Sequence, residues 1–126
     1  MTSFKICRHY YILFYQGKDP VGKGRPLADE VITILRRKYP YVFLLVVKSD
    51  VPEDTMPLLM DRADCLLVCS ISEGSSLIVK ESLAMGLPIV SVDVGDVAEM
   101  TKGVKHCYIV ERNAQKLADA IKEILG

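Results

Sequence analysis

Five short apolar runs recur along the chain, at residues 11–15, 41–47, 65–69, 89–92 and 107–110. Four of them, 11–15, 41–47, 65–69 and 107–110, are apolar at every position, and the run 89–92 has one polar residue, Ser91. A continuous apolar run is typical of a strand that is buried on both faces of a sheet. The pattern therefore predicts five buried β-strands.

The segments between these runs carry apolar residues at helical spacing. One stripe predicts an amphipathic helix from Leu27 to about Lys38. A shorter helix is expected over residues 56–61, with Asp54 or Thr55 as its cap. Two further helices are expected over residues 77–85 and 117–125.

Alternation of strands and helices predicts an α/β fold, a Rossmann-like, doubly wound parallel sheet with strand order 2-1-3-4-5. The switch point then falls between the first and third strands, and ligands of such sheets bind at the carboxyl ends of the strands beside it. The loop 17–26 and the turn 70–76 should therefore face each other. Residues 1–126 are expected to form a single domain, with no room for a second α/β domain.

Charge and hydropathy narrow the class of partner. Lysine plus arginine equals aspartate plus glutamate at 16 each, so nothing favours nucleic acid or an anionic membrane. The run 10–15 is too short to span a bilayer and lacks a cleavage site, so neither a transmembrane segment nor a signal peptide is expected. The four cysteines have no metal or disulfide spacing, which favours reduced thiols in a cytoplasmic protein.

The turn after the third strand is the most informative segment. A strand, a turn of small residues and a helix aim free backbone N–H groups at one point, where an anion can bind. Glu73 and Glu81 bracket this turn with seven residues between them. Because carboxylates repel phosphate, both are expected to point toward hydroxyl groups. Phosphate donors flanked by carboxylates suit a sugar nucleotide.

The loop after the first strand supplies cations for the same site. Lys18 and Lys23 would hold a diphosphate and offset its charge as the leaving group departs. Gly17 and Gly95, which follow the first and fourth strands, are candidates for the rim of the cleft. The loop does not fit the phosphate-binding pattern of the P-loop, since Arg25 stands where that pattern has a hydroxyl.

Several motifs resemble the donor half of glycosyltransferase family 4, a group of retaining sugar-nucleotide transferases with two Rossmann-like domains (the GT-B architecture). They lie at residues 63–68 (Ala-Asp-Cys-Leu-Leu-Val), 73–75 (Glu-Gly-Ser), 80–84 (Lys-Glu-Ser-Leu-Ala), 86–91 (Gly-Leu-Pro-Ile-Val-Ser) and 93–97 (Asp-Val-Gly-Asp-Val). The spacing of the two glutamates also matches the family. This chain would correspond to the carboxyl-terminal domain, the one that binds the donor.

The resemblance implies roles for the acidic side of the site. Glu73 would contact hydroxyls of the donor sugar, and the amides of Gly74 and Ser75 would face that sugar. Glu81 would bind the ribose hydroxyls.

The resemblance also implies roles for the residues around the diphosphate. Lys23 matches the family lysine, and Lys18 stands where the family usually has arginine, so the bidentate fork of a guanidinium is lost there. Ser76 and Leu77 replace a common Pro-Asn pair, and they would contribute their backbone amides.

The implied reaction is transfer of a sugar, with retained anomeric configuration, from a UDP-, GDP- or ADP-sugar and without a metal or other cofactor. The family's acceptor-binding amino-terminal domain is absent from these residues. A partner domain or a separate subunit would have to supply it, and we expect the chain alone to bind donor with little or no transfer.

Other functions fit parts of the sequence. A non-catalytic module that binds a nucleotide or docks a partner could share the fold. A hydrolase or epimerase would need an acid or base near the sugar carbon, and no residue can be placed there. A flavodoxin-like or phosphoacceptor domain shares the strand order but would need acids after the first strand. Fold alone does not decide among these functions.

Overall fold

The core of the fold is a five-stranded parallel β-sheet with the strand order β2-β1-β3-β4-β5. This is a computed structural model that describes residues 8–73 and 76–126. All four strand pairs are parallel, which confirms the predicted doubly wound sheet and its order. The strands are β1 (Tyr10–Gly17), β2 (Val42–Lys48), β3 (Cys65–Val68), β4 (Ile89–Val92) and β5 (Cys107–Val110).

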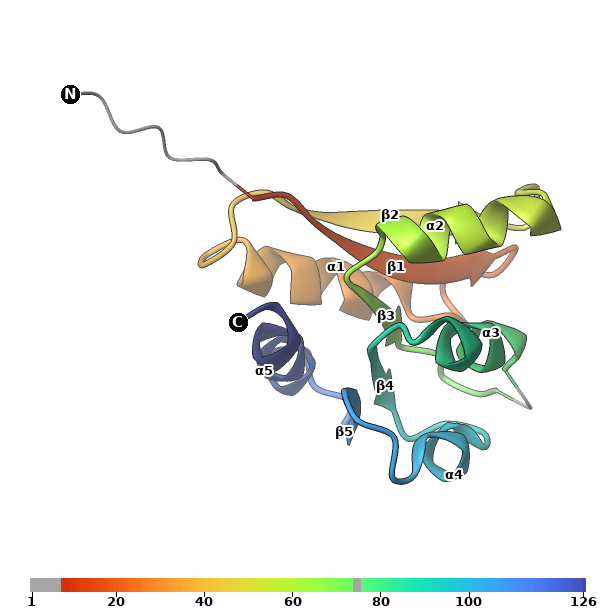
Figure 1. The fold of residues 1–126 in the computed structure, drawn as a ribbon. Coiled ribbons are helices and arrows are strands. Elements are labelled where there is room, and N and C mark those ends of the chain that lie inside the picture. The colour runs from red at the N-terminus through yellow and green to blue at the C-terminus, as the bar shows by residue number, and fades with distance from the viewer. Residues whose placement is uncertain (1–7, 74–75) are drawn as a thin grey trace.

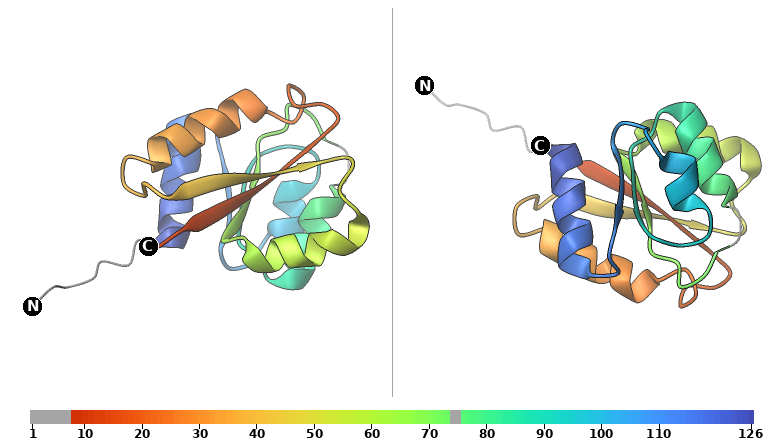
Figure 2. Two further views of the ribbon diagram at one scale, coloured as in Figure 1. Left: turned by 90° about the horizontal axis from the view of Figure 1, so that it is seen from above. Right: turned by 90° about the horizontal axis from the view of Figure 1, so that it is seen from below.

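Helices cover both faces of the sheet. In Figures 1 and 2, α1 (Arg25–Leu35) packs beside α5 (Ala114–Leu125) on one face. The other face carries α2 (Met56–Arg62), α3 (Leu77–Met85) and α4 (Val97–Thr101), and the short 3₁₀ helix η1 (Glu53–Thr55) leads into α2. No helix within the described ranges is both long and apolar enough to cross a bilayer.

The central strands β3 and β4 are buried along their whole length, as the apolar run of β3 and the largely apolar run of β4 predict. The polar exception is Ser91 in β4, whose hydroxyl donates to the carbonyl of Val92 at 2.6 Å. Its hydrogen-bonding group is therefore satisfied inside the core. The start of β3 is tied to β1 by Asp64, whose Oδ2 accepts the backbone N–H of Tyr11 at 2.8 Å.

Four details differ from the sequence-based expectations. The edge strands β2 and β5 are only partly buried, with Phe43 of β2 39% exposed, because each pairs with a neighbour on one side only, so the prediction of five buried strands is wrong for these two. Helix α1 ends at Leu35 instead of about Lys38, because the N–H groups of Arg37 and Lys38 donate three residues back, to the carbonyls of Ile34 and Leu35, in place of the α-helical four. Thr55 occupies the N-cap position of α2, but its side chain makes no capping hydrogen bond, so the predicted side-chain cap is wrong. Helix α4 was not predicted.

Candidate functional site

A tight turn after β1 aims Lys23 at the carboxyl edge of the sheet. Oδ1 of Asp19 accepts the backbone N–H of Gly22 at 2.9 Å, and the carbonyl of Asp19 accepts the N–H of Lys23 at 3.0 Å. This is the local chemistry by which aspartate stabilises turns. The turn ends at Gly24, which has φ +80° and caps the start of α1.

The segment after β1 lies directly against the segment after β3. The backbone N–H of Ile71 donates to the carbonyl of Gly22 at 2.9 Å. A Cβ on Gly24 would overlap the carbonyl oxygen of Cys69, so only glycine permits this approach. The predicted opposition of the two segments is confirmed.

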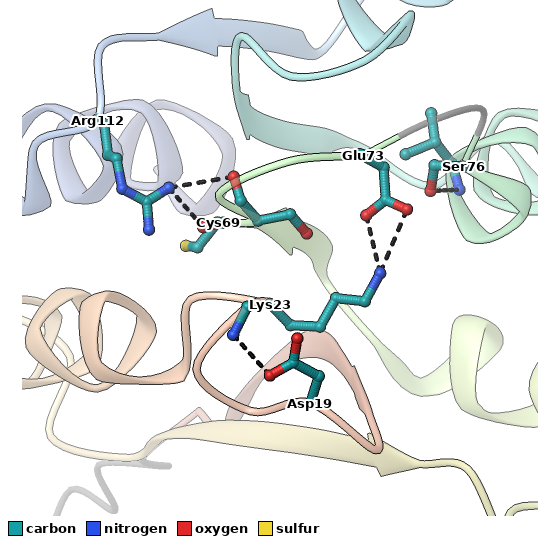
Figure 3. A network of polar contacts seen from close by, with 9 residues as sticks. Asp19, Lys23, Cys69, Glu73, Ser76 and Arg112 are labelled. Atoms are coloured by element: carbon teal, nitrogen blue, oxygen red, sulfur yellow. Dashed lines mark hydrogen bonds and ion pairs between the residues drawn. The ribbon is translucent and has the colours of Figure 1, made fainter.

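Where the two segments meet, Lys23 and Glu73 form an ion pair (Figure 3). Nζ of Lys23 donates to Oε2 of Glu73 at 2.9 Å and to Oε1 at 3.2 Å. The side chains are 25% and 18% exposed, so water screens the pair less than it would a surface pair. The ring of Tyr15 is also near the ammonium, with its centroid 5.8 Å from Nζ.

A cavity of about 800 Å³ opens at the carboxyl ends of β1, β2 and β3, between α2 and α3. The volume is within the range of small-molecule and cofactor sites. Its walls include apolar side chains of α2 and polar residues after β2, among them Ser49 and Glu53. Five of the predicted site residues line it: Lys23, Glu73, Ser76, Leu77 and Glu81.

The first turns of α3 form one wall of this cavity. Ser76 is the N-cap, and its Oγ accepts the N–H of Val79 at 3.4 Å, so the hydroxyl is used to cap the helix. Glu81 lies one turn further along, half-buried, and no ion pair or hydrogen bond involves it among the described residues. Leu77 and Met85 are exposed on either side of it, so this apolar stripe faces the cavity instead of the core.

The remaining predicted site residues are not brought into the cavity. Lys18 is exposed on the loop before the turn and does not line the cavity. Gly17, with φ +56°, is the last residue of β1, and Gly95, with φ +54°, follows β4. Neither glycine lines the cavity. Gly74 and Ser75 fall outside the described residues.

Arg112 is a functional candidate that the sequence analysis did not find. It follows β5, and its Nη1 donates to the carbonyl of Cys69 at 2.6 Å and to that of Ser70 at 3.1 Å. Figure 3 shows it reaching the beginning of the segment whose end carries Glu73. Sequence gives no local signal for a contact between residues 43 positions apart.

The buried thiols near the cavity are unsuited to nucleophilic chemistry. Burial raises the pKa of Cys69 to about 12, although the nearby Arg112 guanidinium acts in the opposite direction. Burial also raises the pKa of Cys65. Within residues 8–73 and 76–126, no three His, Cys, Asp or Glu side chains converge as metal ligands.

Known proteins resemble this chain in sequence and in fold. The chain is 34% identical over 76 residues to TuaC of Bacillus subtilis, a protein named for glycosyl transfer in teichuronic acid biosynthesis. That match spans 60% of this chain but 20% of TuaC.

Solved structures of low sequence identity share the fold. The carboxyl-terminal domain of LpcC, a glycosyl transferase group 1 family protein from Francisella tularensis, has a TM-score of 0.78 at 18% identity; the match covers 92% of this chain and 75% of that one. TarM from S. aureus, solved with fondaparinux, α-GlcNAc-glycerol and UDP, has a TM-score of 0.74 at 17% identity, covering 99% and 31%.

The sequence model of the family described as Glycosyl transferases group 1 matches residues 21–126. This range includes the segment after β3, helix α3 and all the cavity-lining residues that follow β1. The chain therefore belongs to the glycosyl transferases group 1 family.

Proposed function

We propose that this chain binds a nucleoside-diphosphate sugar in the cavity between α2 and α3, as the donor-binding domain of a glycosyltransferase. The convergence of Lys23 and Glu73 in that cavity carries the proposal. The site combines a cation suited to a diphosphate with carboxylates suited to hydroxyl groups. The UDP in the TarM structure supports a nucleotide donor.

Each of the five predicted site residues that line the cavity has a proposed role. Lys23 binds the diphosphate together with the backbone amides of Ser76 and Leu77, at the positive end of the α3 dipole. Glu73 accepts hydrogen bonds from hydroxyls of the sugar, and Glu81 accepts them from the ribose. Glu81 is placed for this role because it is half-buried, lines the cavity and has no partner among the described residues.

The proposed reaction is transfer with retained anomeric configuration. As the bond between the sugar and the diphosphate breaks, negative charge develops on the departing nucleoside diphosphate. The ammonium of Lys23 and the N-terminus of α3 stabilise that charge, which is the role a metal ion has in other transferases. The proposal accordingly includes no metal cofactor.

Complete transfer also requires an acceptor site. The match to this chain covers only 20% of TuaC, so we propose that an amino-terminal domain or a separate subunit binds the acceptor. The isolated chain is expected to bind donor with little or no transfer. A cytoplasmic location is part of the same proposal.

A non-catalytic nucleotide-binding module is the second candidate. It would bind the nucleotide as well, but transfer would not appear when an acceptor-binding domain of the family is supplied. The match covers only 20% of TuaC, a share too small to assign sugar transfer to this chain by itself, so this candidate is retained.

Calorimetric titration with UDP, GDP, ADP and the corresponding nucleotide sugars tests the proposal, with Lys23→Ala and Glu81→Ala as variants. We expect one base series to bind, and both substitutions to weaken it. A folded wild-type chain that binds no member of the panel would contradict donor binding.

A further inference from the structure

Lys23 is proposed to bind the diphosphate of the donor and Glu73 its sugar, but in this structure the two side chains form an ion pair with each other. Both carboxylate oxygens of Glu73 lie within 3.2 Å of Nζ of Lys23, and both side chains line the cavity. A phosphate can bind Lys23 closely only if this carboxylate gives up the ammonium or accepts a second anion beside it. Glu73 therefore competes with the diphosphate for Lys23.

We propose that this competition makes the site select diphosphates that carry a sugar over free diphosphates. The inference rests on the proposed function and adds a discrimination between donor and product. A sugar offers hydroxyl donors to Glu73 when Lys23 turns to the phosphate, so the half-buried carboxylate keeps hydrogen-bond partners. A free diphosphate offers none.

Charge strengthens the same discrimination. A free nucleoside diphosphate ends in a phosphate with one more ionisable oxygen than the sugar ester has. Where the sugar would lie, Glu73 then meets additional negative charge at close range, and like charges in a partly buried site repel strongly. The Lys23–Glu73 pair re-forms as the free diphosphate leaves, which favours release of the product.

Tyr15 keeps the ammonium available when Glu73 is altered. Its ring centroid is 5.8 Å from Nζ of Lys23, so a cation–π contact remains after the carboxylate is removed. Replacing Glu73 with glutamine should therefore leave Lys23 at the cavity and free for an anion.

Inorganic pyrophosphate tests the competition without sugar, ribose or base. We expect Glu73→Gln to bind pyrophosphate about tenfold more tightly than wild type by calorimetry, equivalent to freeing one charged hydrogen bond. Glu53→Gln is the matched control, because Glu53 also lines the cavity and no ion pair involves it in the described part of the chain. The gain at Glu73 should disappear in a Lys23→Gln background.

The nucleotide series tests the discrimination itself. Glu73→Gln should tighten binding of the free nucleoside diphosphate and weaken binding of its sugar ester. The preference for the ester should therefore fall by tenfold or more. Equal effects of Glu73→Gln and Glu53→Gln on pyrophosphate, or no pyrophosphate binding by any variant, would overturn the inference. Absence of nucleotide binding with an intact pyrophosphate response would instead reject the proposed donor while supporting the competition for Lys23.

Discussion

The α-carbon of Gly24 lies so close to the backbone carbonyl of Cys69 that no side chain fits between them. This contact joins the segment after β1 to the segment after β3. Gly24 directly follows Lys23, and Cys69 lies four residues before Glu73. The Lys23–Glu73 ion pair is consequently built on a backbone approach as well as on the attraction of opposite charges. Gly24 is also held at φ +80°, where a side chain is strained.

Gly24→Ala is expected to lower the free energy of unfolding by about 2–5 kcal/mol, because strain at positive φ adds to the overlap with the Cys69 carbonyl. Gly103→Ala is the control: Gly103 has φ +77°, but an added Cβ meets nothing within 4 Å. Gly103→Ala should lower the free energy of unfolding by about 1–2 kcal/mol, from strain alone. Urea denaturation measures both, and equal losses would show that the Gly24 approach is unimportant.

Lys23 and Lys18 are expected to differ in their contribution to nucleotide affinity, although both stand on the loop predicted to hold the diphosphate. Lys23 lines the cavity, whereas Lys18 is exposed outside it. Lys23→Ala should weaken binding of the nucleoside diphosphate by roughly 10- to 100-fold, as for loss of one charged hydrogen bond. Lys18→Ala should change it by less than about threefold. Comparable losses in calorimetry would place Lys18 in the site.

The sheet order and the meeting of the two segments could be predicted from sequence because apolar runs that alternate with helices indicate a doubly wound sheet, a fold class with few common strand orders. Runs such as 65–69 can be buried only in a covered sheet, and parallel topology then brings the loops after β1 and β3 to one edge. The pairing of Lys23 with Glu73 is a finer consequence that needed the path of the turn at Asp19.

Other features left little or no local signal. Helix α4 has five residues, too few for helical periodicity to be visible, and its start is indicated only by Asp96 at the N-cap position and Glu99 three residues later. The stripe of Leu77, Glu81 and Met85 has the spacing of a core face, and only the position of α2 shows that it borders a cavity. Arg112 contributes through a contact between distant segments, which no sequence pattern encodes.

Thiol alkylation is expected to distinguish the cysteines at the sheet. At pH 8, a pKa of about 12 leaves roughly one Cys69 thiol in ten thousand ionised, and burial also restricts access. Iodoacetamide should therefore modify the partly exposed Cys107 of the native protein well before Cys69 or Cys65. Mass spectrometry of digests measures this order, and prompt labelling of Cys69 would mean that the segment after β3 opens readily. In urea the three thiols should react at similar rates.

Arg112 is expected to position the segment after β3, and its loss should reduce both stability and ligand affinity. Arg112→Ala removes hydrogen bonds from a charged donor to the carbonyls of Cys69 and Ser70, at a cost of about 1.5–3 kcal/mol in the free energy of unfolding. Arg36→Ala provides the matched control, because Arg36 also donates to a backbone carbonyl, that of Val42, at the opposite end of the sheet.

The comparison separates positioning from general stability. Both variants should lose stability in urea denaturation, but only Arg112→Ala should weaken nucleotide binding, because Cys69 and Ser70 lead directly into Glu73. Amide exchange gives a readout that needs no ligand: the N–H of Ile71, bonded to Gly22, should exchange at least about tenfold faster in Arg112→Ala and at an unchanged rate in Arg36→Ala. Arg112→Lys should restore part of the protection, since it keeps the charge but reaches fewer acceptors at once. Identical exchange at Ile71 in the two alanine variants would mean that Arg112 stabilises the fold without ordering the site.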